Sequence, residues 1–395
     1  MMTGITRMGA IAYMTSALVA CVVAQFGCSE AEPTMANLGP SELAQEVRSA
    51  LAEPSYLDRN VRLASALAQL DSENVDAVVD VYDELLKGAR EAELEVLFDA
   101  WTRFDAPAAF NYSLEIPYEN LVYFAPRAAA YAWAVKDPLA ALAGAQQGAL
   151  DFPQRSSMIY KGMIEGWAMS GEGGLEDYIL KGPAADDPGQ FILAAQPKIY
   201  LRMGVEGLLE WSEEIIQNAT EYTARMKTFR YAVRTAGFRD PAAAIPFVMR
   251  HYGEEYAKVG PRVLVDTWMH HDSEAAFAWL RTEAPEESRE EALKIVVGSW
   301  LIRDREAARS WIDAAPIGDP YYQPAFDSLA QRIAKRDPKE AVEWCNRGQT
   351  PEINRTCLKQ VATTWYKKDP VAAGVWLEDE SGLPVEDIVK VRERA

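Results

Sequence analysis

Apolar and polar positions recur along most of this chain at intervals of 32 to 36 residues. Within each interval, two stretches carry apolar residues three or four positions apart, the spacing that places them on one face of a helix. A short polar turn separates the two stretches. These turns fall at Asp71, Asp105, Asp137, Gly171, Gly204, Asp240, Asp272, Asp304, Asp337 and Asp369. The pattern predicts about ten helical hairpins with a period near 33 residues, each with a helix A before the turn and a helix B after it.

The aspartates at the turns have a local role. Asp is a favoured N-cap, because its carboxylate accepts the free amides of a helix's first turn and lies at the positive helix end. Pro often follows the Asp, as in Asp369-Pro370, where its missing amide hydrogen costs nothing. We therefore expect the N-caps of the B helices to include Asp137, Asp240, Asp272, Asp304, Asp337 and Asp369.

Aromatic residues keep a fixed register to the turns. One lies four positions before the turn, as at Trp300 and Trp365, and another lies seven positions after it, as at Trp311 and Trp376. Small residues, often Ala, occupy the third and fourth positions after the turn. A residue type required at the same place in every repeat has the same structural task each time. We therefore favour core packing between hairpins over a sugar-binding or cation-binding aromatic surface.

The period and the helix–turn–helix pattern resemble those of tetratricopeptide-like and Sel1-like α-solenoid proteins, over nearly all of residues 40–380. The strict tetratricopeptide signature of Trp, Leu-Gly and Tyr is absent. The resemblance implies an all-α fold, a right-handed α–α superhelix in which each hairpin packs on its neighbours, and a surface that binds proteins or peptides. Residues 381–395 are expected to form a C-terminal cap or tail.

The N-terminal segment has the order of a secretory signal. Arg7 precedes a mostly apolar run from Met8 to Gly27, and a polar stretch follows from Ser29. Two cysteines near its end lie in sequences that resemble the bacterial lipobox, namely Leu18-Val19-Ala20-Cys21 and Phe26-Gly27-Cys28-Ser29. Cys28 is the expected lipidated residue because a polar tether follows it, and Cys21 is the alternative.

These features divide the chain into a signal peptide or membrane anchor at 1–28, a polar tether at 29–39 and the repeat domain at 40–380. An uncleaved single-span anchor and ordinary cleavage are alternatives to lipidation. The expected location is the bacterial cell envelope, where the repeat domain of an outer-membrane lipoprotein would face the periplasm.

Cys345 and Cys357 lie at equal distances on either side of Pro351. In an antiparallel hairpin, equal distances from the turn place two residues opposite each other. A disulfide is therefore one expectation in an oxidising compartment, and two buried free thiols are the other.

The charge balance excludes one class of partner. The formal net charge is -19, whereas nucleic-acid binders need a basic face that displaces counterions. The same balance disfavours broad contact with anionic lipid headgroups.

No catalytic, metal-binding or cofactor-binding constellation stands out. The chain has three histidines, His251, His270 and His271, and no metal-ligand spacing or phosphate loop includes them. The adjacent pair at 270–271 lacks an evident third ligand, so we interpret it as a solvated turn. An enzymatic role is the less favoured hypothesis, and no cofactor is expected.

A basic residue precedes the turn in six hairpins. This basic ladder consists of Lys136, Arg239, His271, Arg303, Arg336 and Lys368. One interpretation is local, since a cation at the C-terminal end of helix A stabilises the helix dipole and pairs with a neighbouring acid. The other is a row of cations that docks an anionic partner, such as an acidic peptide or a glycan.

Together these patterns favour a membrane-anchored periplasmic scaffold or adaptor that binds a protein or peptide on its helical-repeat surface. Envelope assembly is a candidate process for it. A carbohydrate-active or glycan-binding protein with an α/α-toroid fold is the alternative, because such folds also repeat helical hairpins. A purely structural spacer is a third possibility.

Overall fold

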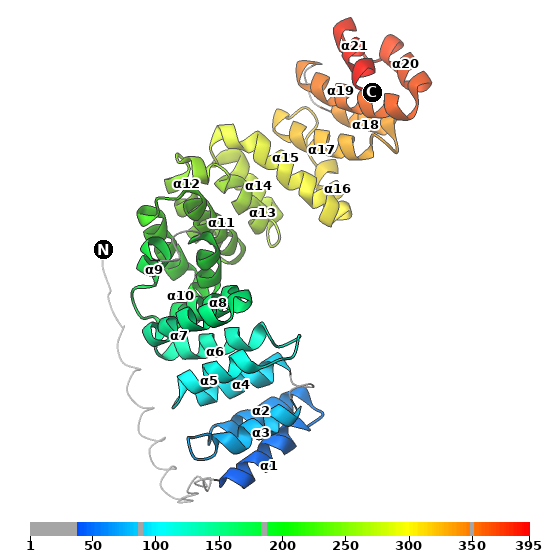
Figure 1. The fold of residues 1–395 in the computed structure, drawn as a ribbon. Coiled ribbons are helices and arrows are strands. Elements are labelled where there is room, and N and C mark those ends of the chain that lie inside the picture. The colour runs from blue at the N-terminus through cyan, green and yellow to red at the C-terminus, as the bar shows by residue number, and fades with distance from the viewer. Residues whose placement is uncertain (1–37, 86–89, 183–187, 348–350) are drawn as a thin grey trace, which may run out of the picture. The chain divides into compact units, whose positions relative to one another are not determined.

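A computed structural model of the chain describes residues 38–85, 90–182, 188–347 and 351–395, with all of their side chains except those of 351–353. The expected lipidation sites, Cys28 and Cys21, and the targeting segment around them lie outside the described residues. The described residues form α-helices and short 3-10 turns, with no strand among them (Figure 1). The prediction of an all-α fold is confirmed.

The chain divides into two compact units, residues 1–86 and 87–395. The first unit contains α1 (Pro40–Leu51), α2 (Tyr56–Leu67) and α3 (Val75–Leu85). Helix α1 packs against both α2 and α3. The packing buries Leu43, Leu63 and Tyr82 completely, so these three helices have an apolar core of their own.

The second unit continues the series of helices. They are α4 (Glu91–Trp101), α5 (Ala106–Glu115), α6 (Phe124–Lys136), α7 (Pro138–Asp151), α8 (Ser156–Ser170), α9 (Leu175–Lys181), α10 (Pro188–Asn218), α11 (Tyr222–Arg239), α12 (Pro241–His251), α13 (Gly260–Trp268), α14 (Ser273–Thr282), α15 (Glu286–Arg303), α16 (Arg305–Asp313), α17 (Gln323–Ile333), α18 (Pro338–Cys345), α19 (Pro351–Lys368), α20 (Pro370–Asp379) and α21 (Val385–Arg394).

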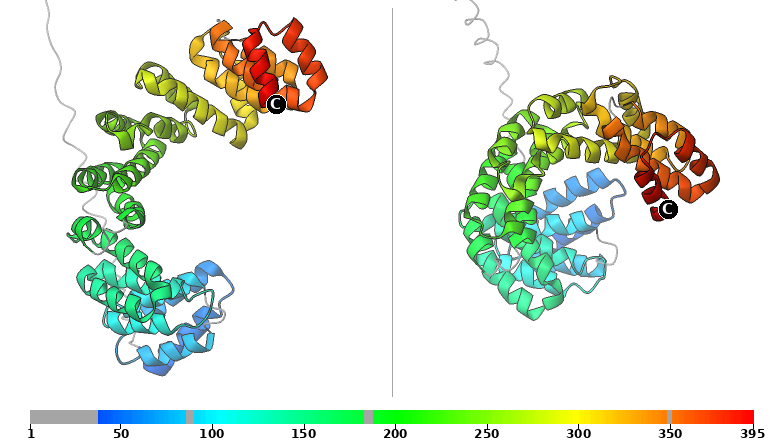
Figure 2. Two further views of the ribbon diagram at one scale, coloured as in Figure 1. Left: turned by 45° about the horizontal axis from the view of Figure 1, so that its top comes forward. Right: turned by 90° about the horizontal axis from the view of Figure 1, so that it is seen from above.

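The predicted turns assign these helices to the two classes. In the second unit, the A helices are α4, α6, α8, the first half of α10, α11, α13, α15, α17 and α19. Extensive contacts join helices that are close in chain order, such as α6 with α8, α11 with α13, and α15 with α17. The hairpins accordingly follow one another in chain order in the views of Figure 2. Each of these helices thus packs mainly on elements that are close to it in the chain.

The aspartates at the turns begin the B helices. In each of the six expected N-caps, the Oδ1 atom accepts a hydrogen bond from the backbone amide three residues later, over 2.9 to 3.1 Å. Asp105 caps α5 in the same way. One aspartate side chain within the hairpin therefore specifies where helix B begins. This local signal is why the turn could be predicted from the sequence.

The two turns that lack Asp use glycine. Gly171 ends α8 with a left-handed backbone, at φ 79°. Gly204 interrupts α10 at φ 73°, which divides this element into helices at 188–203 and 205–218. Positive φ is costly for residues with a Cβ atom, so glycine supplies a tight turn where no side-chain cap is present.

The aromatic register produces ring contacts inside four of the hairpins. The pairs Trp101–Tyr112, Trp167–Tyr178, Trp300–Trp311 and Trp365–Trp376 have ring centroids 5.5 to 6.1 Å apart. Rings also meet between consecutive hairpins, as Phe277 does with Trp300. The aromatics therefore join helix A to helix B as well as one hairpin to the next, and most are buried.

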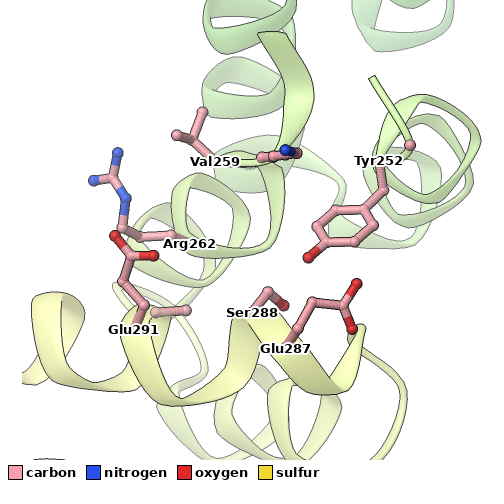
Figure 3. A pocket seen from close by; sticks show the side chains of 9 residues that line it. Tyr252, Val259, Arg262, Glu287, Ser288 and Glu291 are labelled. Atoms are coloured by element: carbon pink, nitrogen blue, oxygen red, sulfur yellow. The ribbon is translucent and has the colours of Figure 1, made fainter. Parts of the chain in front are cut away.

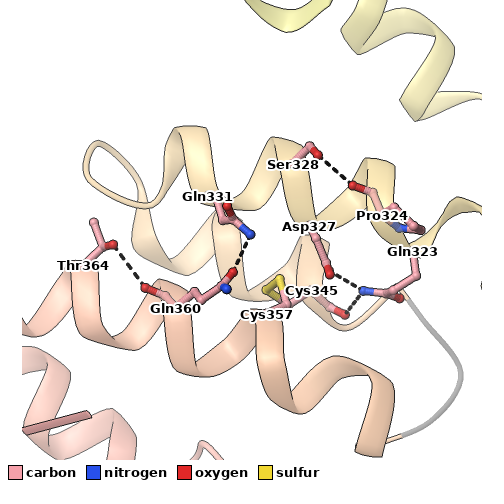
Figure 4. The surroundings of a disulfide bond; sticks show 9 residues. All are labelled: Gln323, Pro324, Asp327, Ser328, Gln331, Cys345, Cys357, Gln360 and Thr364. Atoms are coloured by element: carbon pink, nitrogen blue, oxygen red, sulfur yellow. Dashed lines mark hydrogen bonds between the residues drawn. A yellow bond between two sulfur atoms is a disulfide. The ribbon is translucent and has the colours of Figure 1, made fainter. Parts of the chain in front are cut away.

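A disulfide joins Cys345, the last residue of α18, to Cys357 in α19 (Figure 4). Their Cα atoms lie 5.6 Å apart. Both cysteines are fully buried. The bond fixes helix B of one hairpin to helix A of the next.

Candidate binding surface on the A helices

The basic ladder contacts the preceding hairpin. Lys136 donates to the Asp99 carboxylate at 2.9 Å, and Arg303 donates to Asp266 at the same distance. Lys368 donates to the carbonyl oxygen of Lys335 at 2.9 Å. In each case the cation reaches the end region of the previous A helix, about one period earlier in the chain.

Two further ladder residues use aromatic rings instead of acids. The Arg239 guanidinium lies 5.8 Å from the ring centroid of Tyr200, and the His271 ring lies 4.2 Å from that of Phe238. Arg336 is exposed. Most of the ladder is therefore occupied in joining hairpins, which leaves these groups less available to an anionic partner.

The pockets of the second unit lie mainly on the A helices, and two glycines shape the first of them. A Cβ atom at Gly162 would overlap the carbonyl oxygen of Arg127, and one at Gly166 would overlap that of Tyr131. Helix α8 consequently packs very closely on α6. The same contact places Glu165, which lies between the two glycines, beside the side chain of Arg127.

This α6–α8 pocket has a volume of about 380 Å³ and includes residues of α4, α6, α8 and α10. Glu165 is 8% exposed and accepts hydrogen bonds from Nη2 and Nε of Arg127 at 2.7 and 3.1 Å. The Lys198 ammonium lies 4.9 Å from the ring centroid of Tyr131. The pocket therefore has its own ion pair and cation–π contact.

The pKa of the Tyr131 hydroxyl in this pocket is shifted by its surroundings. Its pKa is raised by burial and then by the charges of Glu165, Glu95 and Asp99. Glu165 and Asp99 are paired with Arg127 and Lys136, so this pocket carries both signs of charge.

The α15–α17 pocket is larger, at about 740 Å³, and also includes residues of α19. Asp327 accepts a hydrogen bond from Nε2 of Gln323 at 2.6 Å, and the same nitrogen lies 3.4 Å from the carbonyl oxygen of Cys345 (Figure 4). Burial raises the pKa of Asp327 to about 6. Lys294 and the Arg281–Asp319 ion pair supply further charge.

A third pocket, the α13–α15 pocket, has a volume of about 540 Å³. Figure 3 shows the Tyr252 ring directed toward Glu287 and Ser288, with Arg262 beside Glu291 farther along α15. Burial, and then the charge of Glu287, raises the pKa of the Tyr252 hydroxyl. Its lining again combines both signs of charge with an aromatic ring.

A fourth pocket, the α10–α11 groove, has a different lining. Its volume is about 170 Å³, and the residues that line it are Leu193, Met226, Lys227, Arg230, Tyr231 and Arg234. No carboxylate is among them. The lining of this groove is therefore basic.

Histidine chemistry does not define a site. His251 is buried and engaged on both ring nitrogens, with Tyr256 Oη at 2.8 Å and Glu213 Oε2 at 3.0 Å. The rings of Phe229 and Phe247 pack against it. His270 and His271 are exposed at their turn, and within the described ranges no group of three or more His, Cys, Asp and Glu residues has metal-binding geometry.

The sequence analysis did not single out the pocket residues. Glu165 meets Arg127, which lies 38 residues earlier, and Gln323 contacts the carbonyl oxygen of Cys345, 22 residues later. No repeated motif marks these residues or Asp327. One signal was visible, however. The 18 residues of α11 contain five cations and no acid, in a chain that has 59 acidic residues.

Comparisons with known proteins assign no family. No family model matches the chain, and neither a curated protein nor a solved structure is detectably similar to it. None of the described helices combines the length and the apolar character needed to cross a membrane.

Proposed function

We propose that this chain is a membrane-anchored adaptor or scaffold of the bacterial cell envelope that holds a protein or peptide segment on its A-helix surface. One observation carries the proposal. Each of the four pockets described above includes A-helix residues in its lining, and each is formed by parts of two or more hairpins.

The chemistry of these pockets favours a polypeptide. Each lining combines charged groups with apolar or aromatic side chains, as in Tyr131 beside Arg127 or Tyr321 beside Arg281. A peptide presents charges and apolar groups at short, regular intervals, so a row of such pockets suits an extended segment. Helical-repeat proteins use their surfaces in this way.

Other features support the proposed location in the cell envelope. The N-terminal segment has the order of an export signal, with a lipobox-like sequence at Cys28. The Cys345–Cys357 disulfide also supports an oxidising compartment.

Photocrosslinking in the full-length, membrane-anchored protein tests the proposal. A photoreactive phenylalanine analogue is placed at Lys294 or Gln360, which line the α15–α17 pocket and are exposed. The matched controls are Leu139 and Val371 on B helices, 66% and 78% exposed. We expect discrete crosslinked proteins at the two A-helix positions alone, competed by the purified partner fragment.

Equal crosslinking at both sets of positions would contradict a binding surface on the A helices. Crosslinks to polysaccharide in place of polypeptide would instead favour a glycan-binding protein.

A further inference from the structure

Helix α11 has an unusual charge for this protein. Its five cations are Arg225, Lys227, Arg230, Arg234 and Arg239, and it has no acidic residue. The chain as a whole has a formal net charge of -19. These cations lie in a chain in which acidic residues outnumber basic ones. Each cation of α11 either contacts another residue of the chain or is exposed to solvent.

The two ends of α11 have internal partners. Arg225 donates from Nε to the carbonyl oxygen of Ala219 at 2.7 Å. Arg239 stacks on the rings of Tyr200 and Phe238. These two cations hold the helix ends in place and are not part of the groove.

The middle of the helix differs. Arg230 and Arg234 are exposed and line the α10–α11 groove together with Lys227. Arg230 contacts the sulfur of Met226 at 3.8 Å, and neither arginine has an ion pair within the described residues. These two arginines therefore place positive charge on the solvent side of α11.

Helix α19 is an A helix in which some of the cations are paired with acids of a neighbouring helix. It also carries several cations, and acids of α21 pair with two of them, Arg355 and Lys359. Arg355 pairs with Glu386 at 2.8 Å and also with Asp387, and Lys359 lies 3.6 Å from Asp387. Within the described residues no acid of a neighbouring helix pairs with Arg230 or Arg234 of α11, so these two arginines are available to the carboxylates of a ligand.

The shape of the groove limits the class of ligand. The cations lie on one stripe of α11 from 227 to 234, about 10 Å long, which corresponds to about three residues of extended peptide. Leu193, which is 43% exposed, Met226 and Tyr231 form apolar walls beside the stripe. Arginine forks bind carboxylates through paired hydrogen bonds, and the apolar walls accommodate an aliphatic or aromatic side chain.

We propose that the α10–α11 groove binds an acidic peptide segment, with two or more carboxylates on Arg230 and Arg234 and an apolar side chain against Leu193 and Met226. The assignment rests on the proposed adaptor function and names the part of the partner that is recognised. It places anion recognition on α11 and not on the basic ladder, whose cations mostly contact neighbouring hairpins.

Fluorescence anisotropy with the purified full-length chain tests this proposal. The probe is a labelled twelve-residue peptide of alternating Glu, Asp, Leu and Phe, and the control peptide has Gln and Asn in place of the acids. The test variant is Arg230→Glu with Arg234→Glu. The matched variant is Arg305→Glu with Lys339→Glu, which changes net charge equally at exposed B-helix positions.

We expect the acidic peptide to bind the wild-type chain, and the neutral peptide to bind at least about tenfold more weakly. The α11 variant should lose about tenfold or more in affinity, while the matched variant loses little and both keep wild-type helicity. Increasing salt should weaken only the binding that depends on α11.

Equal loss in both variants would show a general charge effect and overturn the proposal. Preferential binding to vesicles of anionic phospholipid, sensitive to the same arginines, would assign the groove to a lipid headgroup instead. If photocrosslinks at Lys294 and Gln360 persist in the α11 variant and peptide binding is unaffected, the groove assignment fails while the adaptor function stands.

Discussion

At the scale of single residues, Asp327 combines burial with a position in the α15–α17 pocket. Burial raises its pKa to about 6, because the charged form loses solvation that the hydrogen bond from Gln323 and the charge of Lys294 only partly replace. A carboxyl whose pKa is raised by folding costs stability when it ionises. That cost is absent below the unfolded pKa near 4 and complete above about pH 6.

Asp327→Asn should therefore stabilise the chain at neutral pH, by about 2 kcal/mol. The amide oxygen of the new side chain can still accept the hydrogen bond from Gln323. Urea unfolding at several pH values measures the difference between the variant and the wild type. The difference should shrink as the pH falls from 6 to 4, and a pH-independent difference would show that Asp327 is not the group that titrates.

At the scale of elements, the contact between α6 and α8 depends on two positions without a side chain. A Cβ at Gly162 would meet the backbone of α6, which has no flexible end that could move aside. The helices would have to separate, and Glu165 would shift away from Arg127.

Gly162→Ala should lower the free energy of unfolding by about 2 kcal/mol or more. Gly374→Ala in α20 is the matched control, since a Cβ there meets nothing within 4 Å. The control should stabilise its helix by up to about 1 kcal/mol, because alanine has the higher helix propensity. Far-UV circular dichroism during urea unfolding measures both, and an equal response of the two glycines would contradict the close packing of α6 on α8.

At the scale of the whole molecule, the contacts that stabilise each hairpin come mainly from the hairpins next to it in the chain. The extensive helix contacts join elements that are close in chain order, so a local change is felt mainly by adjacent hairpins. The Cys345–Cys357 disulfide offers a way to examine this, because it joins two hairpins near one end of the second unit.

Reduction of the disulfide should cost about 3 kcal/mol by the chain-entropy estimate for a short loop. Hydrogen exchange should lose protection in α17 to α21, while α6 and α8 keep theirs. A Cys345→Ser, Cys357→Ser variant should show the same pattern with or without reductant. Uniform loss along the chain would mean that the second unit unfolds as one cooperative body.

The hairpins were predictable from the sequence because each is specified by neighbours in the chain. An Asp such as Asp304 caps a helix through an amide three residues away, and Trp300 meets Trp311 within one hairpin. These local signals recur about ten times along the chain. The all-α fold could therefore be predicted without knowledge of any contact between distant residues.

The binding surface was decided by tertiary structure. Glu165 lies under Arg127 because α8 packs on α6, and Arg355 is neutralised because α21 folds back on α19, whereas Arg230 has no such cover within the described residues. Whether a charged side chain is paired depends on which helix lies opposite it. The sequence marks the turns by local motifs, but no motif marks which helix will lie opposite a given charged side chain. The residues that meet there are about 30 positions apart in the chain.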